Sequence, residues 1–276
     1  MEDKWVKIIR DDETINVTEV IPNFIIMEVR ASYPVSTVEN TSTKGVDGEL
    51  PGVATFAPFN LVIKCGFDGF DSYDVNLMEW RLRDIFFSRK PFYIVTSENP
   101  GIKYPVQNPD IQPDYSDYTA TKFEMTFSVY KGYAESINDT SDLNFLNDNW
   151  QFESGVITDE IKYNFNEKRF TVWNGSSDKI DPSLRHRLKL IIHADAPNGL
   201  RIKNYHNDSE FIYYESLSKG DTLVIDGVYP IKNNKRVGIN TNNDWITLER
   251  GNNNIEIDGN GVSNVSAQFV FPFIFR

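Results

Sequence analysis

Short segments of alternating apolar and polar residues recur through the second half of the chain, separated by Gly, Asn and Asp. A period of two predicts strands that bury one face, and Gly, Asn and Asp are typical of the turns between them. The segments are residues 170–173, 187–193, 199–204, 210–215, 222–226, 236–239, 245–248, 253–257 and 265–275. No helix of useful length is predicted after residue 150. This half is therefore predicted to be an all-β sandwich.

The final segment has the longest alternation. Its apolar residues share one face almost to the last residue: Val265, Ala267, Phe269, Phe271, Phe273 and Phe275. A face this apolar is expected to be buried. Pro272 cannot donate a hydrogen bond to a neighbouring strand, so the strand is predicted to lie at a sheet edge or to be bulged there.

The first half contains one predicted helix. Its apolar residues fall on a single face at a spacing of 3.6 residues: Val75, Met78, Leu82, Ile85 and Phe86. Asp71 or Ser72 is placed to cap its N-terminus, and Pro91 follows its end.

Strands are predicted on both sides of this helix. They cover residues 24–31, 59–67, 92–96 and 122–130. A helix laid against antiparallel strands makes this half α+β, so the whole chain is predicted to be mainly β with one helix.

Two long segments of the first half show no regular pattern, residues 38–58 and residues 98–118, and the second holds four prolines. Segments this long are either ordered by a partner or plain connectors. The polar stretch 134–148 indicates a domain boundary near its end. The predicted domains are residues 1–147 and residues 148–276.

Composition narrows the class of protein. The 276 residues are 40% hydrophobic with a formal net charge of -12, which disfavours a general nucleic-acid binder and a partner with an anionic membrane surface. Cys65 is the single cysteine and is predicted to be buried, so no internal disulfide forms. No apolar run is long enough to cross a bilayer, and folding in a reducing cytoplasm is expected.

Catalytic chemistry is not indicated. The three histidines, His186, His193 and His206, lack the spacing of a helical zinc pair. No nucleophile elbow, phosphate loop or dinucleotide fingerprint occurs. The sequence therefore predicts no enzyme, no cofactor and no metal site.

Three tryptophans lie near predicted strand ends or turns of the second half: Trp150, Trp173 and Trp245. Exposed aromatics on a sandwich stack against sugars, which makes these residues candidates for glycan binding. The competing interpretation is packing in the core or at a domain interface, which the usual burial of tryptophan favours.

Residues 220–257, GDTLVIDGVYPIKNNKRVGINTNNDWITLERGNNNIEI, combine a Gly-Asp turn, an Asn-rich hairpin and a Gly-Asn turn in a recognisable order. They resemble the C-terminal domain of siphophage distal tail proteins. Residues 170–227, which begin FTVWNG, continue the resemblance, and the strand-helix-strand unit of residues 59–95 extends it more loosely into the first half.

The resemblance implies an N-terminal, split-barrel-like α+β domain that forms a hexameric ring, followed by a C-terminal galectin-like β-sandwich. In that family the ring is a non-enzymatic baseplate hub in the virion tail, made in the cytoplasm of the bacterial host, here expected to be Gram-positive. The implied partners are the tail tube protein, the tail-associated tip protein and the receptor-binding or baseplate proteins, with DNA only as passing cargo and no membrane.

Residues 38–58 and 98–118 are the expected contacts between subunits of this ring. Two other functions remain open. One is carbohydrate binding at the tail tip through the sandwich. The other is degradation of cell-wall polysaccharide, which no motif supports.

Overall fold

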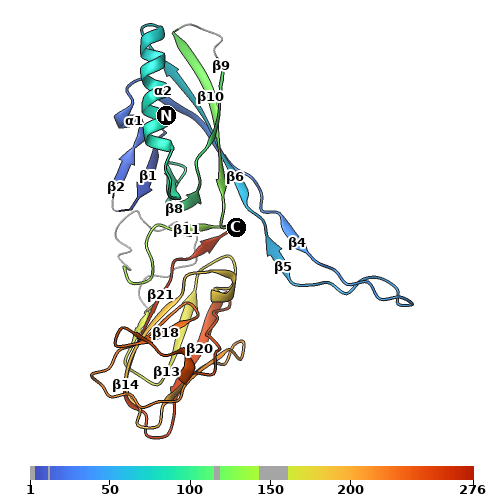
Figure 1. Cartoon of the computed structure of the whole chain (residues 1–276), viewed down its shortest axis with the longest axis vertical. Helices are drawn as coiled ribbons and strands as arrows, with labels where there is room; N and C mark the ends of the chain where they lie inside the picture. The colour runs from blue at the N-terminus through green and yellow to red at the C-terminus, as the bar shows by residue number, and fades with distance from the viewer. Residues whose placement is uncertain (1–3, 12, 115–118, 143–160) are drawn as a thin grey trace. The chain divides into compact units, whose positions relative to one another are not determined.

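The computed structural model describes residues 4–11, 13–114, 119–142 and 161–276. The chain divides into two compact units (Figure 1). Unit 1 comprises Met1–Glu135 and Arg276, and unit 2 comprises Ser136–Phe275. The predicted boundary between residues 147 and 148 lies outside the described residues. Both units consist mainly of antiparallel strands, which confirms the predicted fold class.

Unit 1 is built on an antiparallel sheet in the order β2-β1-β7-β8-β10-β6-β3, with β9 also paired to β10. Its elements are β1 (Val6–Arg10), β2 (Glu13–Asn16), α1 (Val17–Val20), β3 (Phe24–Ala31), β4 (Ser36–Val38), β5 (Ala54–Phe56), β6 (Phe59–Asp68), α2 (Ser72–Phe86), β7 (Phe92–Thr96), β8 (Asn99–Val106), β9 (Asp110–Asp114), β10 (Ala120–Val129) and β11 (Ala134–Ser136), which ends in unit 2. The four predicted strands and the predicted helix are all present.

Helix α2 covers the sheet with the face that its periodicity predicted. Asp71 caps it by accepting hydrogen bonds from the backbone N–H groups of Tyr73 and Asp74. The five predicted apolar residues are buried, and Phe86 packs 5.5 Å from Phe127 of β10, centroid to centroid. Cys65 is fully buried as predicted, and this burial raises the pKa of its thiol.

Unit 2 is a sandwich of two sheets. The six-stranded sheet has the order β12-β21-β14-β17-β18-β19 and the four-stranded sheet β13-β20-β15-β16. The strands are β12 (Asn164–Phe165), β13 (Arg169–Asn174), β14 (Lys189–Asp195), β15 (Leu200–Asn204), β16 (Glu210–Tyr213), β17 (Leu223–Asp226), β18 (Tyr229–Lys232), β19 (Lys235–Arg236), β20 (Gly251–Asp258), β21 (Ser263–Val270) and β22 (Ile274–Phe275), with short 3-10 helices η1 (Pro182–Leu184) and η2 (Gly238–Asn240). Phe165 and Phe170 stack between the two sheets at 4.1 Å.

The interpretation of residues 98–118 as irregular was wrong. Most of that segment forms β8 and β9, and β8 lies inside the sheet between β7 and β10. Pro105 pairs with Tyr93 and accepts a hydrogen bond from the N–H of Tyr130, so the proline contributes its carbonyl to the sheet. A segment inside the sheet is not a free loop for subunit contacts.

The final strand is divided rather than continuous. β21 ends at Val270, and β22 begins at Ile274. Around Pro272 the backbone N–H groups donate to side-chain hydroxyls in place of the carbonyls of a neighbouring strand. The N–H of Phe271 donates to Thr140 Oγ1, and that of Phe273 donates to Ser136 Oγ. The predicted burial of this apolar segment is confirmed, with Phe269, Phe271 and Phe273 almost fully buried.

Residues 236–239 and 245–248 were predicted as strands, and both predictions were wrong over most of their length. The first segment keeps only Arg236 in β19 and continues into η2. The second is irregular apart from one bridge between Leu248 and Ile180. Side-chain amides of buried asparagines donate to carbonyls in this segment and at the residue after it: Asn204 to Thr247 at 2.8 Å, Asn174 to Leu248 at 3.1 Å and Asn253 to Glu249 at 2.8 Å.

Asn253 is the centre of this network. Its Oδ1 also accepts from the N–H of Glu249 at 2.8 Å and from the side chain of Asn204 at 2.9 Å. Asn253→Ala removes the partner of the backbone N–H and carbonyl of Glu249 and one partner of Asn204, so we expect a loss of about 3 kcal/mol in the free energy of unfolding. Urea unfolding measures this loss. The neighbouring Asn252 is exposed, and Asn252→Ala is the matched control; equal losses in the two variants would contradict the role of the network.

Candidate functional site

Residues 35–56 form an arm that leaves the sheet of unit 1 between β3 and β6 (Figure 1). β4 and β5 pair antiparallel along it, from Ser36 opposite Phe56 to Val38 opposite Ala54. At its base the N–H of Ala57 donates to the carbonyl of Val35 at 2.9 Å. The predicted irregular segment 38–58 is thus largely this arm.

Every residue of the arm is exposed, including its apolar residues. Val53 is 82% and Leu50 72% exposed, and Val46 is 66% exposed. A two-stranded ribbon without further packing is at best marginally stable in water. The arm therefore presents apolar side chains that nothing covers among the described residues of unit 1.

Helix α2 carries a second apolar surface besides its buried face. Tyr73, Leu77 and Trp80 follow one another at helical spacing and are exposed, Trp80 by 67%. The guanidinium of Arg83 lies 5.1 Å from the Trp80 ring centroid. The arm and this face of α2 are therefore both exposed apolar surfaces of unit 1.

The structure does not bring the three candidate tryptophans together. Trp150 lies outside the described residues. Trp173, on β13, is partly buried with its indole edge-on to Phe273 at 5.6 Å. Trp245 is partly buried in the irregular segment before β20, and its indole N–H donates to Asp181 Oδ1 at 3.3 Å.

A polar surface covers the outer face of the four-stranded sheet. Alternate residues of three neighbouring strands point to this face: Arg169, Thr171 and Trp173 on β13, Asn252, Asn254, Glu256 and Asp258 on β20, and Arg201 and Lys203 on β15, which Tyr205 follows. Strand pairing sets Arg169 beside Glu256, and Glu256 beside Lys203. We call this set the outer polar face.

Glu256 organises the outer polar face. It accepts hydrogen bonds from Arg169 and from the hydroxyl of Tyr205, on the strands to either side. These groups lie over it, and Glu256 is only 8% exposed although it points outward. The hydrogen bond from Tyr205 and, to a smaller extent, that from Arg169 lower the pKa of Glu256. Glu256 is therefore a carboxylate at neutral pH.

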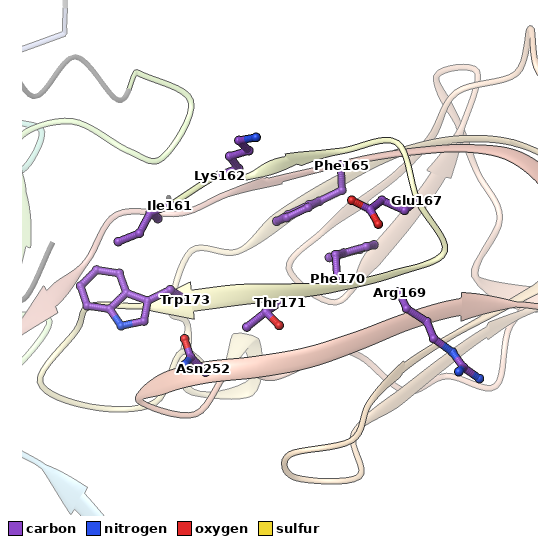
Figure 2. Close-up of a pocket in the computed structure, with 9 residues that line it drawn as sticks. All are labelled: Ile161, Lys162, Phe165, Glu167, Arg169, Phe170, Thr171, Trp173 and Asn252. Atoms are coloured by element: carbon purple, nitrogen blue, oxygen red, sulfur yellow. The ribbon is translucent and has the colours of Figure 1, made fainter. Parts of the chain in front are cut away.

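Two hollows adjoin each other on this side of unit 2. One, of about 660 Å³, follows β13, and the other, of about 580 Å³, lies over Arg169, Thr171, Tyr205, Asn254 and Glu256. Figure 2 shows the first: Arg169, Thr171 and Asn252 lie on one side of β13, and the stacked rings of Phe165 and Phe170 on the other. Trp173 lines the first hollow, and Trp245 lines neither.

The sequence pattern pointed to the tryptophans and not to the other residues of the outer polar face. The available signal was the alternation of NNNIEID, which turns Asn252, Asn254 and Glu256 to one side. The pairing of β20 with β13 and β15 is not visible in that pattern, since the paired residues are far apart in the sequence.

The described ranges contain no group of three or more His, Cys, Asp or Glu side chains arranged to hold a metal ion. His186 is buried and accepts a hydrogen bond at Nδ1 from the N–H of Asp181 at 3.1 Å. Within those ranges, too, none of the helices has the length and apolar character needed to cross a membrane.

Comparison with known proteins finds a family similarity in the first unit. Residues 11–129 match the model of the phage tail protein RIFT-related domain, and this segment lies within unit 1. A search for curated proteins of similar sequence finds no match.

Among solved structures, the chain is similar to the Dit protein of phage SPP1, described as a paradigm of the hub adsorption apparatus in phages that infect Gram-positive bacteria. The two chains are 12% identical, the match covers 97% of this chain and 99% of that chain, and the TM-score is 0.67. A chain of the phage p2 baseplate in its activated conformation with calcium is 14% identical, with coverage of 99% and 98% and a TM-score of 0.42.

The first of these structures shows that the fold extends over both units. The family description names a phage tail protein, in agreement with the predicted location in the virion tail and the predicted non-enzymatic, structural class. Residues 11–129 therefore match the family model of the phage tail protein RIFT-related domain, and the whole chain has the fold of the Dit protein of phage SPP1, in agreement with the sequence resemblance to distal tail proteins.

Proposed function

We propose that six copies of this chain form a ring that joins the tail tube to the tail-tip, baseplate and host-adhesion proteins. Unit 1 builds the ring, because it holds both the matched family domain and the arm. Unit 2, Ser136–Phe275, is the proposed second domain of the hub, for which the sequence predicted residues 148–276.

The arm is the observation that carries this proposal. An exposed apolar ribbon and the exposed face of α2 are different surfaces of one unit. A contact between different surfaces of identical chains is heterologous, and such contacts generate a closed ring when the rotation between copies closes. Of the two segments predicted to make subunit contacts, the proposal keeps residues 38–58 and drops residues 98–118.

The negative net charge of the chain suits a ring through which DNA passes better than a site that binds DNA. A net charge of -12 repels phosphate groups at long range, so an open ring lets DNA pass without holding it. The tail tube, tip and receptor-binding proteins are the proposed neighbours along the tail axis.

The mass of the purified full chain in native mass spectrometry tests the proposal. We expect a species of six times 31.8 kDa, and a six-fold ring in electron micrographs of the same sample. A chain that stays monomeric at concentrations of about 10 µM, near those at which weak protein contacts form, would overturn it.

A further inference from the structure

The cations of the outer polar face are all paired with carboxylates. Arg169 pairs with Glu256, Arg201 with Asp258, and Lys203 with the nearby Asp208 at 3.0 Å. The cations and carboxylates pair across the strands, Arg201 with Asp258 at 2.9 Å and with Glu210 at 3.4 Å. A neutral, hydroxyl-rich ligand suits such a surface better than an anion or a polycation.

The face also offers hydrogen-bonding groups in fixed positions. Thr171 Oγ1 donates to Asn254 Oδ1 at 3.0 Å. This hydrogen bond fixes the orientation of the Asn254 side chain and of its amide N–H groups. Glu256 is held by Arg169 and Tyr205 from two sides. Groups that are already oriented lose little entropy when a ligand binds.

Tyr205 adds the aromatic surface. Tyr205 is 52% exposed, so its ring is open to solvent. The hydrogen bond from its hydroxyl to Glu256 fixes the orientation of the ring. Trp173 lies two strands away and two residues along, roughly 12 Å from Tyr205 by strand spacing and rise. An oligosaccharide of a few residues covers such a span.

We propose that the outer polar face is a binding site for a neutral oligosaccharide. The sugar rings stack on Tyr205 and extend toward Trp173, while Arg169, Asn254 and Glu256 bond their hydroxyls. Ordinary ion pairs on a solvated sheet explain Arg201 and Asp258 equally well. They do not explain why the exposed ring of Tyr205 is hydrogen-bonded through its hydroxyl to the nearly buried carboxylate of Glu256. Both residues line the hollow of about 580 Å³.

The inference does not depend on ring formation, because all its residues belong to unit 2. The test uses the full chain and four probes: chitotetraose, cellotetraose, maltotetraose and galactotetraose. Saturation-transfer NMR and calorimetric titration at concentrations up to about 10 mM cover the affinity range of weak saccharide sites. We expect at least one tetrasaccharide to bind.

Variants of Tyr205 link that binding to the face. Tyr205→Ala is expected to weaken the affinity at least about tenfold, the usual size of a lost stacking contact. Tyr205→Phe keeps the ring and loses the bond to Glu256, so a smaller loss of about threefold is expected.

Tyr229→Ala is the matched control. Tyr229 lies on β18 of the other sheet, is 58% exposed and has a guanidinium at 5.5 Å from its ring, much as Tyr205 has the ammonium of Lys203 at 5.3 Å. Its replacement should leave saccharide affinity unchanged. Asn254→Ala is a second probe of the face in case Tyr205→Ala fails to fold, and it should also weaken binding.

Failure to bind any of the four tetrasaccharides overturns the inference. So does binding that persists unchanged in both Tyr205→Ala and Asn254→Ala. Either result leaves the proposed ring untouched, because the ring is judged by mass and symmetry alone.

Discussion

Replacing residues 36–56 with an Asn-Gly turn is expected to convert the ring into a folded monomer. The replacement is sterically simple because Val35 and Ala57 are already joined by a 2.9 Å hydrogen bond, and Asn-Gly closes such a hairpin. Beyond its base, where the guanidinium of Arg276 lies 3.9 Å from the Phe56 ring centroid, the arm is exposed, so its removal should not unfold the sheet. Native mass spectrometry would show a single chain, and circular dichroism a β-rich fold.

Two further variants separate the apolar side chains from the mere presence of the arm. The triple variant Val46→Ser, Leu50→Ser, Val53→Ser keeps the length of the arm and should also dissociate the ring. Lys44→Gln changes an exposed polar residue of the same arm and should leave six copies together. A hexamer that persists after replacement of the arm would show that other surfaces hold the ring.

Phe127→Ala is expected to cost about 4 kcal/mol in the free energy of unfolding, the usual range for removing a buried phenylalanine. Phe127 is fully buried and contacts both Phe86 of α2 at 5.5 Å and Phe92 of β7 at 6.5 Å. Its loss therefore weakens the packing of β10 against both α2 and β7.

The measurement belongs in the monomer with the arm replaced, because assembly adds its own stability to the folded state. Urea unfolding of that monomer with and without Phe127→Ala gives the difference. Phe70→Ala is the control, since Phe70 is 94% exposed just before α2. A cost below about 1 kcal/mol for Phe127→Ala would mean that the core closes around the gap.

Periodicity in the sequence predicted the elements whose stability comes from one buried face. Helix α2 and β10 are examples, because each shows one apolar face at its own period. β8 and β9 escaped prediction because Pro105 and Pro113 are typical of irregular segments. In the structure each proline still pairs in register with a residue of the neighbouring strand, and Pro105 also accepts a hydrogen bond.

The irregular segment before β20 shows the opposite error. The composition and alternation of residues 245–248 are typical of a strand. In the structure, however, side-chain amides donate hydrogen bonds to the backbone carbonyls of Thr247 and Leu248. Whether an asparagine sets a turn or replaces a strand depends on residues distant in sequence, such as Asn174 and Asn204. The outer polar face was missed for the same reason, because it is assembled from three strands.

The arm also bears on how the chain stays soluble before assembly. A free apolar ribbon with two open edges is a template for aggregation. Charged residues are interspersed with its valines and leucine, namely Glu39, Lys44, Asp47 and Glu49. Charges placed in this way act as gatekeepers against non-specific pairing of strands. If the proposed ring forms through the arm, one segment carries both the side chains that bind the neighbouring copy and the charges that oppose pairing with other strands.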